Sequence, residues 1–99
     1  MLRVIIERQV KEDKQGELIT LLRELRVAAV HQPGYVTGET LVSTEDTSII
    51  STLSTWRSQT DWKAWEKSGS RNRLNQQIEP LLREKPKISI YEVMATEEK

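Results

Sequence analysis

Three tryptophans constrain the fold of this chain more than any other feature. Trp56, Trp62 and Trp65 fall within ten residues of one another, in a chain of 99 residues that contains no phenylalanine. The segment around them, residues 33–68, reads as a turn, two strands and a helix. Large flat side chains at a strand–helix junction need apolar surroundings. They either complete the core of the domain or form the wall of a pocket for a flat guest molecule.

The spacing of apolar and turn residues predicts four strands, at residues 2–10, 35–43, 48–56 and 87–94. Val4, Ile5 and Ile6 are consecutive, so both faces of the first strand are apolar. Gly38 inside the second strand indicates a bulge or a close backbone approach. The short polar turn between the second and third strands predicts a hairpin.

Three helices are predicted, at residues 14–31, 59–67 and 71–82. The first has one apolar stripe, made of Leu18, Leu21, Leu22, Leu25, Ala28 and Ala29. We expect Asp13 to cap its N-terminus and the Pro33–Gly34 pair to end it. Ser58 begins the second helix, with Asp61 three residues later as a variant of the capping box.

This order of elements predicts a ferredoxin-like βαββαβ fold of the α+β class, with helices on one face of one antiparallel sheet. Residues 1–99 form a single domain, in which residues 95–99 are a frayed tail. The last strand places Ile88 and Ile90 on one side and Tyr91 and Val93 on the other, so the second face of the sheet also needs cover. A homodimer that packs sheet against sheet, as a dimeric α/β barrel, is the simplest cover.

Composition excludes several classes of function. The 15 basic and 15 acidic residues cancel and are scattered, so no basic face for nucleic acid is expected. The absence of cysteine excludes disulfides and Cys-ligated metal sites, and a single histidine does not build a usual transition-metal site. No apolar run is long enough to span a membrane and no signal peptide is recognised, so a cytoplasmic protein without nucleic-acid or membrane partners is expected.

Three stretches of the chain carry a family resemblance: the Pro33–Gly34 turn, the strand end Ser54-Thr55-Trp56, and Asp61-Trp62-Lys63-Ala64-Trp65. In these the chain resembles the antibiotic biosynthesis monooxygenase family, and the flanking elements follow the order of that family. The resemblance implies a small dimeric α/β-barrel protein. The family includes cofactor-free aromatic monooxygenases and heme-degrading monooxygenases.

The heme-degrading members combine a helical tryptophan with a histidine that ligates iron and an asparagine on the first strand. Trp65 matches the tryptophan, but Asn75 stands where the histidine would fall. Glu7 or Arg8 stands where the asparagine would lie, and the single histidine, His31, ends the first helix. The resemblance therefore argues against heme and for a protein without a cofactor.

The cofactor-free members oxidise electron-rich phenolic polycycles with O2, and need a polar or cationic group for the substrate oxygen and an aromatic wall. The resemblance implies that Trp65, Asn75 and Arg8 are candidate catalytic residues. The candidate residues for binding a small aromatic ligand are Trp62, Trp56, Tyr91 and His31.

Each candidate residue also has a purely structural interpretation. Trp56 fits a corner of the core, and His31 fits a cationic cap at the C-terminus of a helix. Asn75 lies among polar helical residues and fits the surface. Arg8 alternates with Val4 and Ile6, so it either points inward to an acidic partner or lies beyond the buried part of its strand; the usual exposure of arginine favours the second.

Three classes of function remain open. The first is a monooxygenase that acts on or binds a flat aromatic molecule, and the second is a non-catalytic ligand-binding or assembly module of the same fold. The third, which the residues favour least, is a heme-binding or heme-degrading protein without the usual ligand. A cavity lined by Trp65 and at least one buried polar residue would favour the enzyme or the binder over a module with a filled core.

Overall fold

The computed structural model describes all 99 residues. Its four strands are β1 (Leu2–Gln9), β2 (Tyr35–Val42), β3 (Ile49–Trp56) and β4 (Lys87–Glu92). They form one antiparallel sheet in the order β2-β3-β1-β4, which is open rather than closed into a barrel. The helices are α1 (Gln15–Val30), α2 (Gln59–Glu66) and α3 (Gly69–Ile78), followed by the 3₁₀ turn η1 (Glu79–Leu81).

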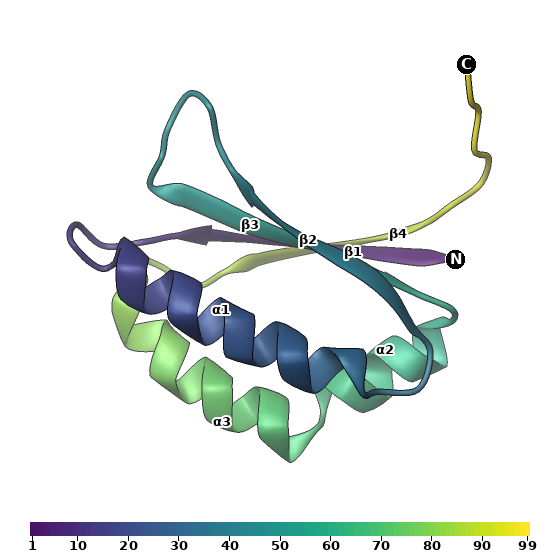
Figure 1. Cartoon of the computed structure of the whole chain (residues 1–99), viewed down its shortest axis with the longest axis horizontal. Helices are drawn as coiled ribbons and strands as arrows, with labels where there is room; N and C mark the ends of the chain where they lie inside the picture. The colour runs from purple at the N-terminus through teal and green to yellow at the C-terminus, as the bar shows by residue number, and fades with distance from the viewer.

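All three helices lie against the same face of the sheet (Figure 1). This arrangement confirms the ferredoxin-like βαββαβ fold predicted from the order of the elements. No helix of the chain combines the length and the apolar character that a membrane crossing requires.

The core lies between the central strand β1 and helix α1. Burial alternates along β1, where Leu2, Val4 and Ile6 are buried and the residues between them are more exposed. This is the period of a strand with one covered face. The apolar stripe of α1 packs against it through Leu18, Leu22, Leu25 and Ala29, all of which are buried. The predicted stripe is thus the packing face of the helix.

Two helix starts differ from the prediction. Asp13 does not cap α1, because it has a positive φ of 64° in the turn before the helix, and Lys14 occupies the cap position without a side-chain hydrogen bond. The third helix begins at Gly69, two residues earlier than expected, because the Ser68 side chain accepts a hydrogen bond from the Arg71 backbone N–H. At the start of α2 the expected cap is present, since Ser58 accepts from the Asp61 N–H at 3.1 Å.

The turn before β2 is fixed to the start of α2. Gly34 has φ 81°, a conformation that side chains other than glycine rarely adopt. The side chain of Asp61 occupies the space where a Cβ of residue 34 would lie. The Gly34 carbonyl also accepts a hydrogen bond of 2.8 Å from the Arg57 N–H. These contacts place Tyr35, the first residue of β2, directly against the tryptophan cluster.

No helix of this chain lies on the second face of the sheet (Figure 1). The strand register places Ile5, Leu41, Leu53 and Tyr91 on this face, opposite to the buried residues of β1. Leu41 and Tyr91 are 44% and 58% exposed. We call these four residues the open-face patch.

Candidate functional site

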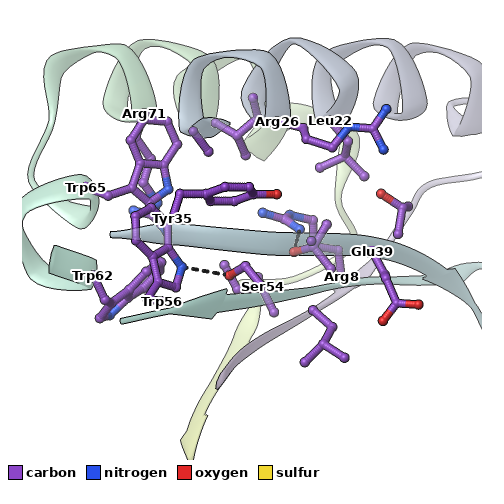
Figure 2. A pocket seen from close by; sticks show the side chains of 17 residues that line it. Arg8, Leu22, Arg26, Tyr35, Glu39, Ser54, Trp56, Trp62, Trp65 and Arg71 are labelled. Atoms are coloured by element: carbon purple, nitrogen blue, oxygen red, sulfur yellow. Dashed lines mark hydrogen bonds between the residues drawn. The ribbon is translucent and has the colours of Figure 1, made fainter. Parts of the chain in front are cut away.

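A cavity lies between the helix-covered face of the sheet and the three helices. Its walls come from β1, β2, β3 and all three α-helices, and only β4 and the 3₁₀ turn η1 do not contribute. Its volume is about 60 Å³. At roughly 10–15 Å³ for each water molecule, this holds a few waters. The cavity has an aromatic end and a polar end (Figure 2).

The aromatic end is built around Trp56, which is fully buried. Trp65 stacks on it with ring centroids 6.3 Å apart and an interplanar angle of 24°. Trp62 and Tyr35 meet it edge to face, at 5.9 Å and 5.3 Å. The Trp56 indole N–H donates to the Ser54 hydroxyl at 3.0 Å, so its polar group is satisfied. The three tryptophans are therefore core residues and cavity wall at the same time.

Arg8 forms the polar end from the central strand. Its side chain is 1% exposed and lies on the helix-covered face with Ile6 and Val10. Its Nη1 donates to the Thr52 hydroxyl at 3.1 Å, and its Nε has no hydrogen-bond partner. The expectation of a solvated Arg8 is wrong, because α1 covers this part of β1. The alternative of an acidic partner is wrong as well, since no ion pair forms at Arg8.

Burial, together with the smaller effect of the nearby positive charge of Arg71, lowers the pKa of Arg8 to about 10. A pKa of about 10 leaves the guanidinium protonated at neutral pH. The cavity thus contains a positive charge that no side chain neutralises.

Arg71 is a second buried cation in the lining, and sequence reasoning missed it. It is 8% exposed, its guanidinium carbon lies 5.3 Å from the centroid of the Trp62 ring, and its Nη1 lies 3.4 Å from the Glu66 carbonyl oxygen. Burial lowers the pKa of Arg71, while the charge of Glu66 raises it. The signal in the sequence is weak, because Arg71 stands in a polar helix beside Asn72 and Arg73.

Tyr35 also lines the cavity and was not among the predicted site residues. Its ring crosses Gly38, and the Tyr35 hydroxyl occupies the space of a Cβ at that glycine. The close approach expected at Gly38 is therefore present, next to a register irregularity between Tyr35 and Thr37. Burial raises the pKa of the Tyr35 phenol, and the positive charge of Arg26 opposes this effect.

Two hydroxyl residues of β3, Thr52 and Ser54, complete the polar lining. They pair with Ile6 and Val4 of β1 and so face the helices. Side chains alternate between the two faces along a strand, so Thr52 and Ser54 lie on the same covered face as Trp56. Small polar residues at positions that alternation assigns to the core were the available signal for a hollow there.

The remaining predicted residues lie elsewhere. Asn75 is half-buried on α3 but does not line the cavity. His31 is exposed at the C-terminal cap of α1, which agrees with its structural interpretation. Tyr91 lies on the open face of the sheet, paired with Arg3. The cavity unites Trp56, Trp62, Trp65 and Arg8, and any binding or catalytic role, for these four as for the other three, stays a prediction.

The sequence model of the family described as antibiotic biosynthesis monooxygenase matches residues 1–77. The match includes the tryptophan cluster, Arg8 and Arg71. The chain belongs to the antibiotic biosynthesis monooxygenase family. No curated protein sequence matches it significantly.

Solved structures share the fold of this family member at low identity. A conserved protein from Methanosarcina mazei Go1 is 21% identical with a TM-score of 0.87, over 91% of this chain and 89% of that one. Rv0793 from Mycobacterium tuberculosis is 15% identical with a TM-score of 0.88, over 96% of each chain. A mutant of SnoaB, a cofactor-independent oxygenase from Streptomyces nogalater, is 10% identical with a TM-score of 0.86, over 96% of this chain and 94% of that one.

The lining of the cavity does not fit the iron site that the heme-degrading members of the family require. No histidine or cysteine lines it, and no three His, Cys, Asp or Glu side chains of the chain are grouped as ligands for a metal ion. The donors that the cavity does present are guanidinium, phenol and hydroxyl groups, which bind oxygen atoms of organic molecules.

Proposed function

We propose that this protein binds a flat aromatic small molecule in the cavity and oxidises it with O2, without a metal or a flavin. The cavity itself carries the proposal, because it joins an aromatic wall to an unneutralised buried cation. Ligand sites commonly combine an apolar lining with a few polar groups in this way. The cofactor-independent oxygenase SnoaB shares the fold, and its activity supports the proposal of an oxidation without a cofactor.

In this proposal the ring of the substrate lies against Trp65 and Trp56 and its oxygen points to Arg8. A volume of about 60 Å³ is smaller than a polycyclic molecule needs. One edge of the ring system therefore enters the cavity, and the rest extends through the mouth beside Arg26 and Glu39. Arg8 stabilises the anion that forms when the substrate loses a proton, since a cation in a buried site interacts strongly with developing charge.

An anthrone illustrates the balance of the reaction. Its anion gives electrons to O2, and the methylene carbon becomes a carbonyl. That carbon loses its hydrogens and gains one oxygen atom of O2, while the other oxygen atom leaves as water. The substrate is the only reductant, so no added electron donor is needed.

Aerobic and anaerobic incubation with an anthrone tests this function. We expect formation of the quinone above the rate of the uncatalysed reaction in air, and none without O2. A Trp65→Ala variant should lose most of this rate, and Val27→Ala, on the exposed surface of α1, is the matched control. A rate in air equal to that of the protein-free reaction would contradict the proposal.

The second candidate function is a non-catalytic module that binds the same class of molecule. Arg71 favours this binding module. Its guanidinium stacks on Trp62 and stiffens the aromatic end of the cavity, but it does not supply a base that could remove a proton from the substrate. Quenching of tryptophan fluorescence by an anthraquinone, together with no turnover of the anthrone, would support the binder over the enzyme.

We also propose that two copies pack their sheets together through the open-face patch, as in a dimeric α/β barrel. The patch supports this, because it places apolar side chains on a surface that no element of the chain covers. Such exposed patches are typical of association surfaces. A twofold axis would bring the same strands of both copies face to face.

A further inference from the structure

Arg8 has far more hydrogen-bonding capacity than the protein satisfies. A guanidinium carries five N–H donors. Only one hydrogen bond is formed, from Nη1 to Thr52, although the side chain is 1% exposed. The Nε is fully buried without any partner. Buried donors are almost always paired, so a buried guanidinium that lines a cavity and makes a single hydrogen bond indicates a missing acceptor.

A second guanidinium adds to the positive charge. Arg71 is also buried in the lining, and its charge lowers the pKa of Arg8, so the two cations act on each other. The ion pairs of the chain are Met1–Glu92 and Lys14–Glu17. Neither guanidinium therefore has a carboxylate oxygen within 4.0 Å. Glu66 is the acidic residue whose charge acts on Arg71, but Arg71 contacts only its backbone carbonyl.

The one acid of the cavity, Glu39, does not neutralise this pair, because it forms no ion pair with either guanidinium. Glu39 lines the end away from Trp65 (Figure 2) and is exposed to solvent. Water molecules in the cavity can accept the free N–H groups, but they cannot neutralise two charges. A buried cation without a counter-ion is costly, so a sequence that keeps one in a cavity has a use for it there.

We propose that the ligand of this cavity is an aromatic carboxylate, whose carboxylate group binds Arg8 at the polar end while Arg71 supplies the second positive charge. The aromatic body of the ligand rests on the proposed function, and the permanent negative charge goes beyond it. Of the five N–H donors of Arg8, one binds Thr52 and a carboxylate takes two, so a donor remains for the substrate oxygen of the proposed function. The planar fork of a guanidinium matches a carboxylate in size and geometry.

Binding of matched acids and amides tests the charge. The probes are 2-naphthoate, its neutral isostere 2-naphthamide, and cyclohexanecarboxylate, which has the charge without the aromatic ring. Quenching or shift of tryptophan fluorescence reports binding, because all three tryptophans line the cavity; calorimetry reports it for cyclohexanecarboxylate. We expect 2-naphthoate to bind about tenfold or more tightly than 2-naphthamide.

Arg8→Met removes the charge and keeps most of the volume. This variant should weaken the binding of 2-naphthoate by about tenfold or more and change the affinity for 2-naphthamide by less than about threefold. It should also raise Tm, because the buried charge without a counter-ion is gone. Arg3→Met is the matched control, on the same strand but on the opposite face, and should change neither affinity. If Arg8→Met fails to fold, Arg71→Gln gives the same comparison, with a smaller selective loss of the acid.

The outcomes separate the two proposals. Equal affinity for 2-naphthoate and 2-naphthamide overturns the carboxylate site and leaves the aromatic site standing. Binding of cyclohexanecarboxylate alone supports the carboxylate site and overturns the aromatic function. Binding of none of the three overturns both. An equal loss of acid and amide in Arg8→Met also overturns the carboxylate site, since it assigns Arg8 a purely structural role.

Discussion

The two faces of the sheet bury their side chains in different ways. On the helix-covered face, the large residues of β1 pack against the apolar stripe of α1, and the region beside Arg8 stays hollow. On the other face, Leu41 and Tyr91 stay 44% and 58% exposed, with no element of the chain above them. Helices of the chain cover one face, and the other face is the surface on which we propose that a second copy packs.

The hollow on the covered face has a local cause. Between the large residues Ile50 and Trp56 of β3 stand Thr52 and Ser54, and Gly38 of β2 pairs with Ser54. These side chains are too short to reach α1, so space remains above them. Tyr35 partly covers that space, since its hydroxyl lies over Gly38. Small residues on a covered face therefore make a cavity, whereas apolar residues on an uncovered face make an interface.

The largest expected effect is at the centre of the aromatic end. Trp56→Ala should lower the free energy of unfolding by about 3–5 kcal/mol, because a fully buried indole leaves a cavity behind. Urea unfolding followed by circular dichroism measures this change. Thr37→Ala, on the open face of neighbouring strand β2, should stay within about 0.5 kcal/mol. A loss at Trp56 no larger than at Thr37 would contradict the role of this tryptophan in the core.

A charge in the open-face patch should change association instead of folding. Ile5→Glu places a carboxylate at the centre of the patch, so we expect a dimer to become a monomer with little change in far-ultraviolet circular dichroism. Sedimentation equilibrium over a range of concentrations measures the molar mass. Val27→Glu is the control, because Val27 is an apolar residue that is 58% exposed on α1, outside the patch. This variant should leave the mass unchanged. A monomeric unmodified protein would refute the proposed dimer.

The smallest effect concerns the pH dependence at Tyr35. Burial raises the pKa of its phenol above the usual 10.0, so the unfolded chain releases this proton at lower pH than the folded protein does. The contribution to stability is therefore complete below the unfolded pKa and is lost as the pH rises through the folded pKa. Thermal unfolding at increasing alkaline pH should show this loss, and Tyr35→Phe should reduce it. In Tyr91→Phe, where Tyr35 is the remaining tyrosine, phenol ionisation followed by ultraviolet absorbance should occur above pH 10.0.

The local sequence pattern was sufficient to predict most of the fold, because the spacing of apolar residues distinguishes strands from helices. It misplaced Asp13, where a left-handed turn conformation replaced the expected cap. In the site, the tryptophans were predictable from their number and spacing. Arg71 and Tyr35 were not, because Arg71 packs on Trp62 of another helix and Tyr35 packs on Trp56 of another strand.

The sequence alone determined the order of the elements, the antiparallel sheet with helices on one face, and the family. These depend on periodicity and on short motifs, which are local properties of the chain. The tertiary structure decided which face of β1 holds Arg8, that no acid accompanies it, and that the space beside the tryptophans is hollow. These properties depend on how several strands and helices pack together, so no single segment of the sequence predicts them. The tryptophans mark where the site is, and the unpaired arginine beside them indicates what it binds.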